Sequence, residues 1–85
     1  MKNLKKSIEN YNEKNGLIGR DKMTQKKLAK KLVENRKENI LQIVNYYHLI
    51  NRIINNRIDK FPINLVNDIS IILETTPNYL YDFKV

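Results

Sequence analysis

Hydrophobic residues recur every three or four positions along most of this chain, which is the spacing of one face of an α-helix. The pattern predicts a first helix over residues 3–14, ended by a left-handed cap at Asn15-Gly16. A second helix is expected to begin at Thr24, because a threonine hydroxyl can accept a hydrogen bond from the first turn. The apolar positions behind these predictions are Leu4, Ile8 and Tyr11 in the first helix and Leu28, Ala29, Leu32 and Val33 in the second.

The longest helical pattern covers residues 40–58 and fits either one helix or two with a break near Asn45. Another helix is predicted after Phe61-Pro62, and a short last one from Thr76-Pro77, since proline is favoured in a first turn. The apolar positions are Ile40, Ile43, Val44, Tyr47, Ile50, Ile54 and Ile58 in the long pattern and Leu65, Val66, Ile69, Ile72 and Leu73 after Pro62. The predicted fold class is all-α, with four to five helices in a single domain over residues 1–85.

The net charge of +7 is unevenly distributed along the chain. Residues 1–37 hold 12 basic and 4 acidic side chains, whereas residues 61–85 hold 1 and 3. A basic N-terminal half beside an acidic, apolar C-terminal third favours a protein that binds a polyanion on one surface and a protein on another. Nucleic acid is the first expected partner.

Composition excludes several classes of function. Without cysteine and with a single histidine, the chain has no disulfide framework, no thiolate metal site and no all-histidine metal site. No apolar run is long enough for a signal peptide or a membrane span, so we expect a cytoplasmic protein with no membrane partner. We also expect neither an enzyme nor a cofactor, because the chain lacks a glycine-rich phosphate loop, a cysteine nucleophile and paired carboxylates.

Several runs of residues resemble one known family. Met23-Thr24-Gln25-Lys26-Lys27-Leu28-Ala29 is similar to the second helix of the phage-repressor and Cro type helix-turn-helix family (XRE, lambda-repressor-like). Ile50-Asn51-Arg52-Ile53-Ile54-Asn55-Asn56 resembles that family's recognition helix, and Thr76-Pro77-Asn78-Tyr79-Leu80 resembles its closing segment. An earlier run, Ile40-Leu41-Gln42-Ile43-Val44-Asn45, also resembles the recognition helix. We prefer the later run, because its Arg-Ile pair and its spacing to Pro62 fit the family better.

The resemblance implies which residues contact DNA. A helix N-terminus with flanking lysines can hold phosphates, whereas asparagine, arginine and tyrosine can contact bases. The expected phosphate contacts are Thr24, Gln25, Lys26, Lys27 and Lys30, with Arg57 and Lys60 in the loop after the recognition helix. The expected base contacts are Tyr46, Tyr47, His48, Asn51, Arg52 and Asn55. Two alternatives stay open: one of the adjacent tyrosines belongs to the core, and His48 and the lysines are ordinary surface residues.

The function implied is a sequence-specific, DNA-binding transcriptional regulator, a repressor, of a phage, plasmid or other mobile element. Its partner would be double-stranded DNA, bound as a homodimer through aromatic residues of the last segment, because a two-fold dimer on a palindromic site increases specificity. These aromatic residues are Tyr79, Tyr81 and Phe83. The alternative is a protein-binding module of the same fold, an inhibitor or antirepressor, because residues 16–22 and 33–45 enlarge the family's connections. A regulatory protein partner is compatible with both interpretations.

Overall fold

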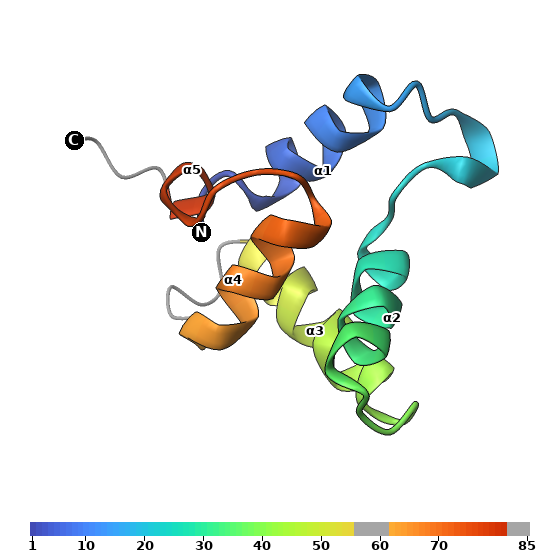
Figure 1. Ribbon diagram of the computed structural model, residues 1–85, viewed down its shortest axis with the longest axis vertical. Helices are drawn as coiled ribbons and strands as arrows, with labels where there is room; N and C mark the ends of the chain where they lie inside the picture. Colours follow the sequence, from blue (N-terminus) through green and yellow to red (C-terminus); the bar gives the residue numbers. More distant parts are fainter. Residues whose placement is uncertain (56–61, 82–85) are drawn as a thin grey trace.

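The computed structural model describes residues 1–55 and 62–81, and every regular element in these two ranges is helical (Figure 1). The prediction of an all-α fold is confirmed. The elements are α1 (Leu4–Lys14), the 3-10 helix η1 (Gly19–Asp21), α2 (Gln25–Arg36), α3 (Gln42–Ile54), α4 (Ile63–Ile72) and α5 (Pro77–Tyr81). No helix in the described ranges is long and apolar enough to cross a membrane.

Hydrogen bonds confirm two of the predicted helix ends. Gly16 has a left-handed backbone with φ of 61°, and the N–H of Leu17 donates to the carbonyl of Asn12 at 2.9 Å, which closes α1. At the start of α2, the Oγ1 of Thr24 accepts the N–H of Lys27 at 3.2 Å. Both signals are local, because each bond joins residues within a few positions of one another.

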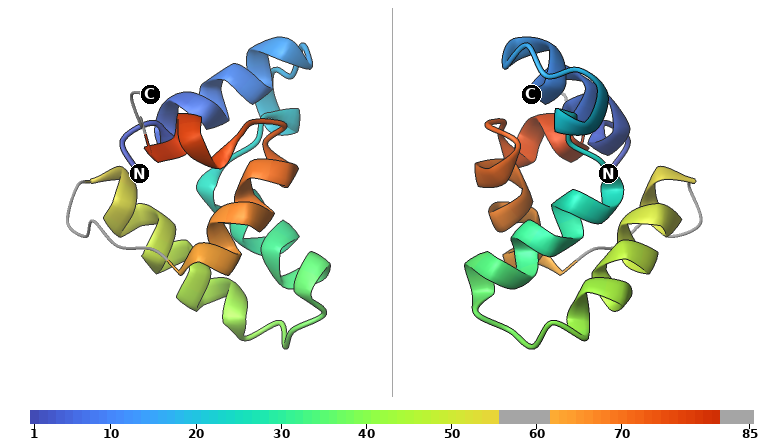
Figure 2. Two further views of the ribbon diagram at one scale, coloured as in Figure 1. Left: turned by 60° about the vertical axis from the view of Figure 1, so that its left-hand side comes forward. Right: turned by 90° about the vertical axis from the view of Figure 1, so that its right-hand side faces the viewer.

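Residues 33–45, whose structure the sequence left open, contain the end of α2, a link over residues 37–41 and the start of α3. Lys37 ends α2 with a left-handed backbone at φ of 52°, and the N–H of Glu38 donates to the carbonyl of Val33 at 3.1 Å. From Gln42 onward α3 runs through Asn45 without a break. The link is therefore short, and α2 and α3 diverge from it in Figure 2.

The buried face of α3 differs from the face that the apolar pattern predicted. Tyr46, Ile50 and Ile53 are buried, whereas Val44 and Tyr47 are 58% and 37% exposed. Apolar residues lie on both sides of this helix, so helical spacing alone does not determine which side faces the core. The predicted stripe was wrong for Ile40, Val44 and Tyr47, and it omitted Tyr46 and Ile53.

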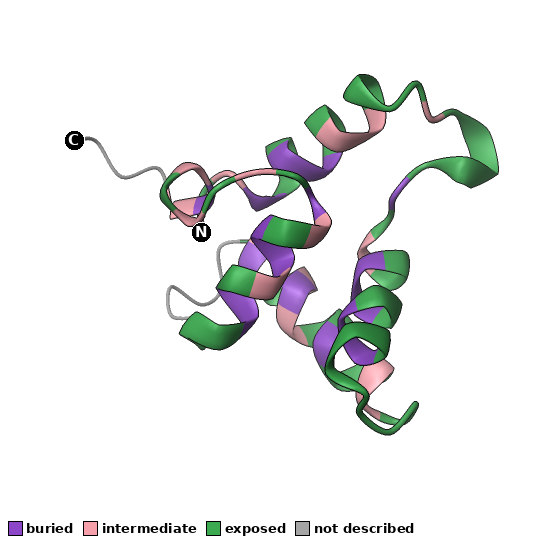
Figure 3. Cartoon of the chain, in the orientation of Figure 1, coloured by how far each residue is buried: buried purple, intermediate pink, exposed green. Residues whose placement is uncertain are grey.

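The other predicted stripes form the core, and α2 packs against both α3 and α4. On α4 the prediction is confirmed for four positions, with the fifth, Ile72, half-buried. Figure 3 shows the buried residues on the sides of the helices that face one another, while the turn after α2 is exposed throughout. The core comprises Leu4, Ile8, Met23, Leu28, Ala29, Leu32, Val33, Tyr46, Ile50, Ile53, Leu65, Val66, Ile69, Leu73 and Leu80.

The last helix starts as predicted and holds the first residues of the chain. Thr76 Oγ1 accepts the N–H of Tyr79 at 3.2 Å, and Pro77 occupies the first helical position of α5. The N–H of Asn3 donates to the carbonyl of Leu80 at 3.1 Å, and its side-chain amide donates to the carbonyl of Tyr79 at 2.9 Å. This docking of α5 leaves α2 and α3 to form the opposite part of the molecule (Figure 1).

Candidate nucleic-acid interface

A cleft of about 660 Å³ lies between the start of α2 and the first half of α3. It brings together residues that the sequence assigned to phosphate contact and residues that it assigned to base contact. The lining residues are Thr24, Gln25 and Lys26 from α2 and Ile43, Val44, Tyr47 and His48 from α3. Two helix segments about 20 residues apart in the chain therefore share one open surface.

The start of α2 is exposed and positively charged. The first N–H groups of a helix have no partner within the helix, and the Thr24 hydroxyl takes only the N–H of Lys27. Lys26 and Lys30 are exposed and one turn apart, so they lie on the same side of α2. No acidic residue occurs between Thr24 and Val33. This end of α2 therefore attracts anions through both its backbone and its side chains.

Gln25 lines the cleft and carries an unsatisfied polar atom. Its Oε1 is buried and has no hydrogen-bond partner in the described part of the chain. A buried acceptor without a donor costs about 1–3 kcal/mol of folding stability. The start of α2 therefore carries a local cost to the fold beside the cleft.

Lys27 has a role that the sequence did not indicate. Its Nζ donates to the backbone carbonyls of Arg20 and Lys22, the latter at 3.0 Å, and so ties α2 to the segment that contains η1. The lysine stays on the surface, as predicted, but its ammonium group already has acceptors. Lys26 and Lys30 are better placed to reach a phosphate.

The adjacent tyrosines of α3 lie on opposite sides of the helix. Tyr47 borders the cleft, where its ring meets that of His48 edge-on at 5.8 Å. Tyr46 is buried, and its hydroxyl donates to Glu38. Tyr46 was among the expected base contacts, but in this structure it belongs to the core, because its hydroxyl has an internal partner and its ring is covered.

The remaining expected base contacts lie in the second half of α3. Asn51 is half-buried, while Arg52 and Asn55 are exposed. The side-chain amide of Asn55 donates to the Oδ1 of Asn51 at 2.7 Å and to its carbonyl at 2.9 Å. None of the three lines the cleft, whose α3 residues end at His48.

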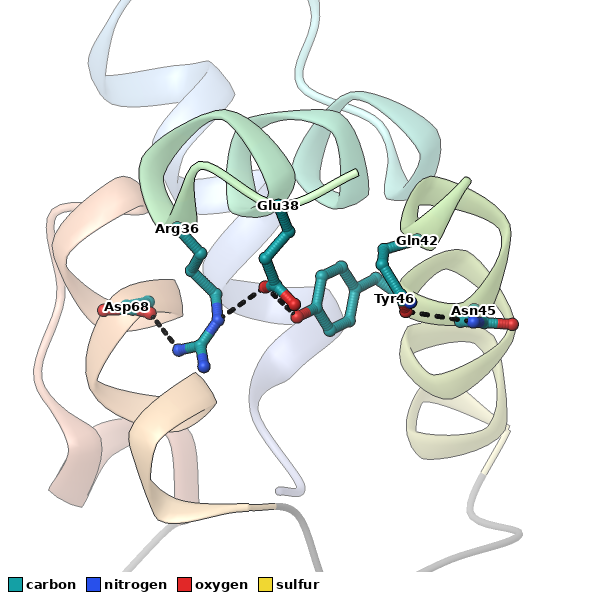
Figure 4. A network of polar contacts seen from close by, with 6 residues as sticks. All are labelled: Arg36, Glu38, Gln42, Asn45, Tyr46 and Asp68. Carbon is teal, nitrogen blue, oxygen red and sulfur yellow. Dashed lines mark hydrogen bonds and ion pairs between the residues drawn. The ribbon is translucent and has the colours of Figure 1, made fainter. Parts of the chain in front are cut away.

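Near the end of α2, a network of polar side chains joins α2, α3 and α4 (Figure 4). Arg36 donates to Asp68 at 2.8 Å and to the Oε1 of Glu38 at 2.7 Å, and the Tyr46 hydroxyl donates to the same Glu38 oxygen. The hydrogen bond from Tyr46, followed by Arg36, lowers the pKa of Glu38. Burial and the bond to Glu38 raise the pKa of Tyr46, and the two carboxylates raise the pKa of Arg36. We call these four residues the corner network.

The expected dimer residues are only partly described. Tyr79 and Tyr81 are half-buried on α5, and the Tyr79 hydroxyl accepts a hydrogen bond from the Asn10 side chain at 3.2 Å. Ile63 and Ile71 of α4 are far more exposed, at 72% and 71%. Arg57, Lys60 and Phe83, together with Ile58 of the long apolar pattern, lie outside the described residues.

Sequence reasoning missed a group of exposed apolar residues at the start of α3. Ile40 is 71% exposed and Leu41 is 74% exposed, and both precede the first turn of α3. Val44 follows one turn later and borders the cleft. We call Ile40, Leu41 and Val44 the apolar tip. One feature of the sequence could have revealed these exposed residues. Apolar residues occur on both sides of α3, and a helix can bury only one side against the core.

Comparison with known proteins gives no further assignment, since no protein-family model, curated protein or solved structure matches the chain.

Proposed function

We propose that this protein binds double-stranded DNA with the cleft side of α2 and α3 and acts as a transcriptional regulator, a repressor that covers its site. The observation that carries the proposal is the juxtaposition across the cleft of an anion-attracting helix start with the exposed side of α3. Between residues 24 and 55 the chain has seven Lys and Arg but only two Glu, and one of these, Glu38, is paired with Arg36. A polyanion fits this surface better than a neutral or basic partner.

Each half of the surface has a distinct role in the proposal. Thr24, Lys26 and Lys30 hold the phosphate backbone, which sets affinity and salt dependence but not sequence choice. The outer side of α3 enters the major groove, whose width accepts an α-helix. Tyr47 and His48 contact base edges, since both are exposed beside the cleft.

The position of α3 also favours one of the two runs that resemble a recognition helix. Helix-turn-helix proteins insert the N-terminal part of their second helix into the groove. Residues 40–45 lead into the start of α3 beside the cleft, whereas residues 50–55 form its last turns. We therefore propose the earlier run as the reading end, with Asn51, Arg52 and Asn55 contacting the flank of the site.

A homodimer is part of the proposal, with α4 as its interface. Ile63 and Ile71 are two turns apart on α4, and Asn67, also exposed, lies between them. This side of α4 has no charged residue, so two copies can face one another without the repulsion that the basic side of α2 would cause. A dimer predicts that the DNA site is an inverted repeat.

The test is selection from a random duplex library, followed by fluorescence anisotropy against the selected site and a shuffled duplex of equal length at several salt concentrations. We expect an inverted repeat, bound at least about a thousandfold more tightly than the shuffled duplex. The DNA upstream of the protein's own gene is a natural second probe. Equal, weak and steeply salt-dependent binding to all duplexes would contradict sequence-specific binding and would leave only the attraction of a net charge of +7 for DNA.

A further inference from the structure

The apolar tip is exposed, yet it is held in a defined conformation. The Oδ1 of Asn39 accepts the N–H of Leu41 at 2.9 Å, and the carbonyl of Ile40 accepts the N–H of Ile43 at 3.1 Å. The corner network holds the preceding residue, Glu38, against α3. A side chain presented on such a fixed turn loses little conformational entropy when it binds a partner.

The surroundings of the apolar tip indicate an anionic partner with small apolar groups. Val44 borders the same cleft as Lys26, and Lys37 is exposed at the end of α2. The acidic side chain next to the tip, Glu38, has its charge paired with Arg36. Aliphatic side chains cannot bond to phosphates or to the polar edges of bases, so on a DNA-binding face they require an apolar surface of the DNA.

In the major groove, the apolar group that distinguishes one base pair from another is the 5-methyl group of thymine. Ile40 lies in the turn that leads into α3, where its carbonyl accepts the N–H of Ile43, and Val44 follows in the first turn of the helix. One helical turn separates side chains by about 5–6 Å, and we take this as the approximate spacing of the two. Successive bases of one strand rise by about 3.4 Å, so the two side chains span one or two base steps.

We propose that the apolar tip reads thymine methyl groups and makes this protein select thymines at adjacent or alternate positions of its site. The inference rests on the proposed DNA-binding function and names the residues and the chemical group that set its sequence choice. Ile40 and Val44 contact the methyl groups, and Leu41 covers the neighbouring step.

Replacement of single thymines by deoxyuridine in the selected site tests the proposal, because uracil pairs as thymine does and lacks only the methyl group. We expect each contacted thymine to lose about fourfold in affinity on replacement, which corresponds to the burial of one methyl group. The other thymines of the site should show no loss, so the sensitive positions form one short cluster in each half-site.

The variants Ile40→Ser and Val44→Ala connect this loss to the protein. Each should bind the thymine site more weakly than the unmodified protein and should no longer distinguish thymine from uracil at its own position. Ile18→Ser is the matched control, because Ile18 is as exposed as Ile40 but lies just before η1 and does not line the cleft. It should keep the full sensitivity to uracil. Circular dichroism checks that all three variants retain the helical fold.

The outcomes separate the two proposals. A selected site whose affinity is the same with uracil at every position would overturn the inference and leave DNA binding intact. Tip variants that bind every duplex as the unmodified protein does would also overturn it, and would leave the tip free for a partner protein. Failure to select any site would overturn the proposed function, and the inference with it.

Discussion

The corner network and the cleft are both built on α2 and the first half of α3, but they differ in whether their polar groups have partners. At the corner network, Arg36, Glu38, Tyr46 and Asp68 satisfy one another and join three helices. At the cleft, the Oε1 of Gln25 is buried without a partner, and the cations of α2 lie beside exposed aromatic rings.

Because their polar groups differ in this way, we expect the corner network to contribute to folding stability and the cleft to contribute to binding. Polar groups that already pair with one another stabilise the fold and have little left to offer a ligand. A buried polar group that stays unpaired lowers stability, whereas the exposed cations beside it remain available to a ligand. Substitutions at the corner network should therefore act on unfolding, and substitutions at the cleft should act mainly on DNA affinity.

The largest expected effect comes from the cations of the cleft. In Lys26→Gln with Lys30→Gln, DNA affinity should fall on the order of a hundredfold for each bound protomer near 0.1 M salt, because each lysine accounts for about one released counterion. The slope of log affinity against log salt should decrease by about 2 for each protomer, and so by about 4 for the dimer. Anisotropy titrations at four salt concentrations measure both quantities.

A matched control removes the same charge elsewhere. Lys5→Gln with Lys6→Gln, on exposed positions of α1, should change the affinity and the salt slope far less. If both double variants lost the same affinity, net charge alone would account for binding, and the cleft would have no special role.

Substitution of Gln25 should change both folding stability and DNA affinity. Gln25→Met keeps the length of the side chain and removes the unsatisfied oxygen, so unfolding free energy should increase by about 1 kcal/mol, which raises the melting temperature by about 4–8 °C. DNA affinity should decrease in the same variant. Thermal unfolding and anisotropy on one preparation measure the pair of effects.

Gln42→Met is the comparison for this variant. Gln42 accepts a hydrogen bond from Asn45 at 3.0 Å, so its replacement should not stabilise the fold. Equal stabilisation by both substitutions would show that methionine favours these helices generally, and would contradict the role assigned to the buried oxygen.

The smallest expected effect is a pH dependence at the corner network. The folded state lowers the pKa of Glu38, so its carboxylate stabilises the fold above the usual pKa of about 4.3, and this contribution disappears as pH falls through the lowered value. Urea unfolding between pH 7 and pH 3 should show a loss of stability that is smaller in Glu38→Gln. Parallel pH profiles for the two proteins would contradict the assignment.

Much of the fold could be predicted because its signals are local. The cap at Gly16, the N-cap at Thr24 and the proline start of α5 each depend on bonds within a few residues. The core stripe of α4 was equally clear, since Leu65, Val66, Ile69 and Leu73 follow one helical spacing and are all buried. On α3, apolar residues occupy both sides, and the pattern indicated the wrong side for Tyr47.

In the candidate site, too, the residues with local sequence signals were predicted and those placed by packing were predicted only in part. The residues at the start of α2 were found by sequence, because a helix N-terminus with lysines has a recognisable pattern. The residues that face them across the cleft were only partly found. Val44 was assigned to the core, and Tyr46 was expected on the surface.

By itself, the sequence determined that this protein is helical, where most of its helices begin and end, and that its positive charge lies in the first half. Backbone capping, helical spacing and ionisation depend on residues close together in the chain. Only the tertiary structure decided which side of α3 is buried, that Lys27 binds backbone carbonyls, and that the starts of α2 and α3 share a cleft. These features depend on how helices pack, and packing chooses among apolar faces that the sequence alone leaves equivalent.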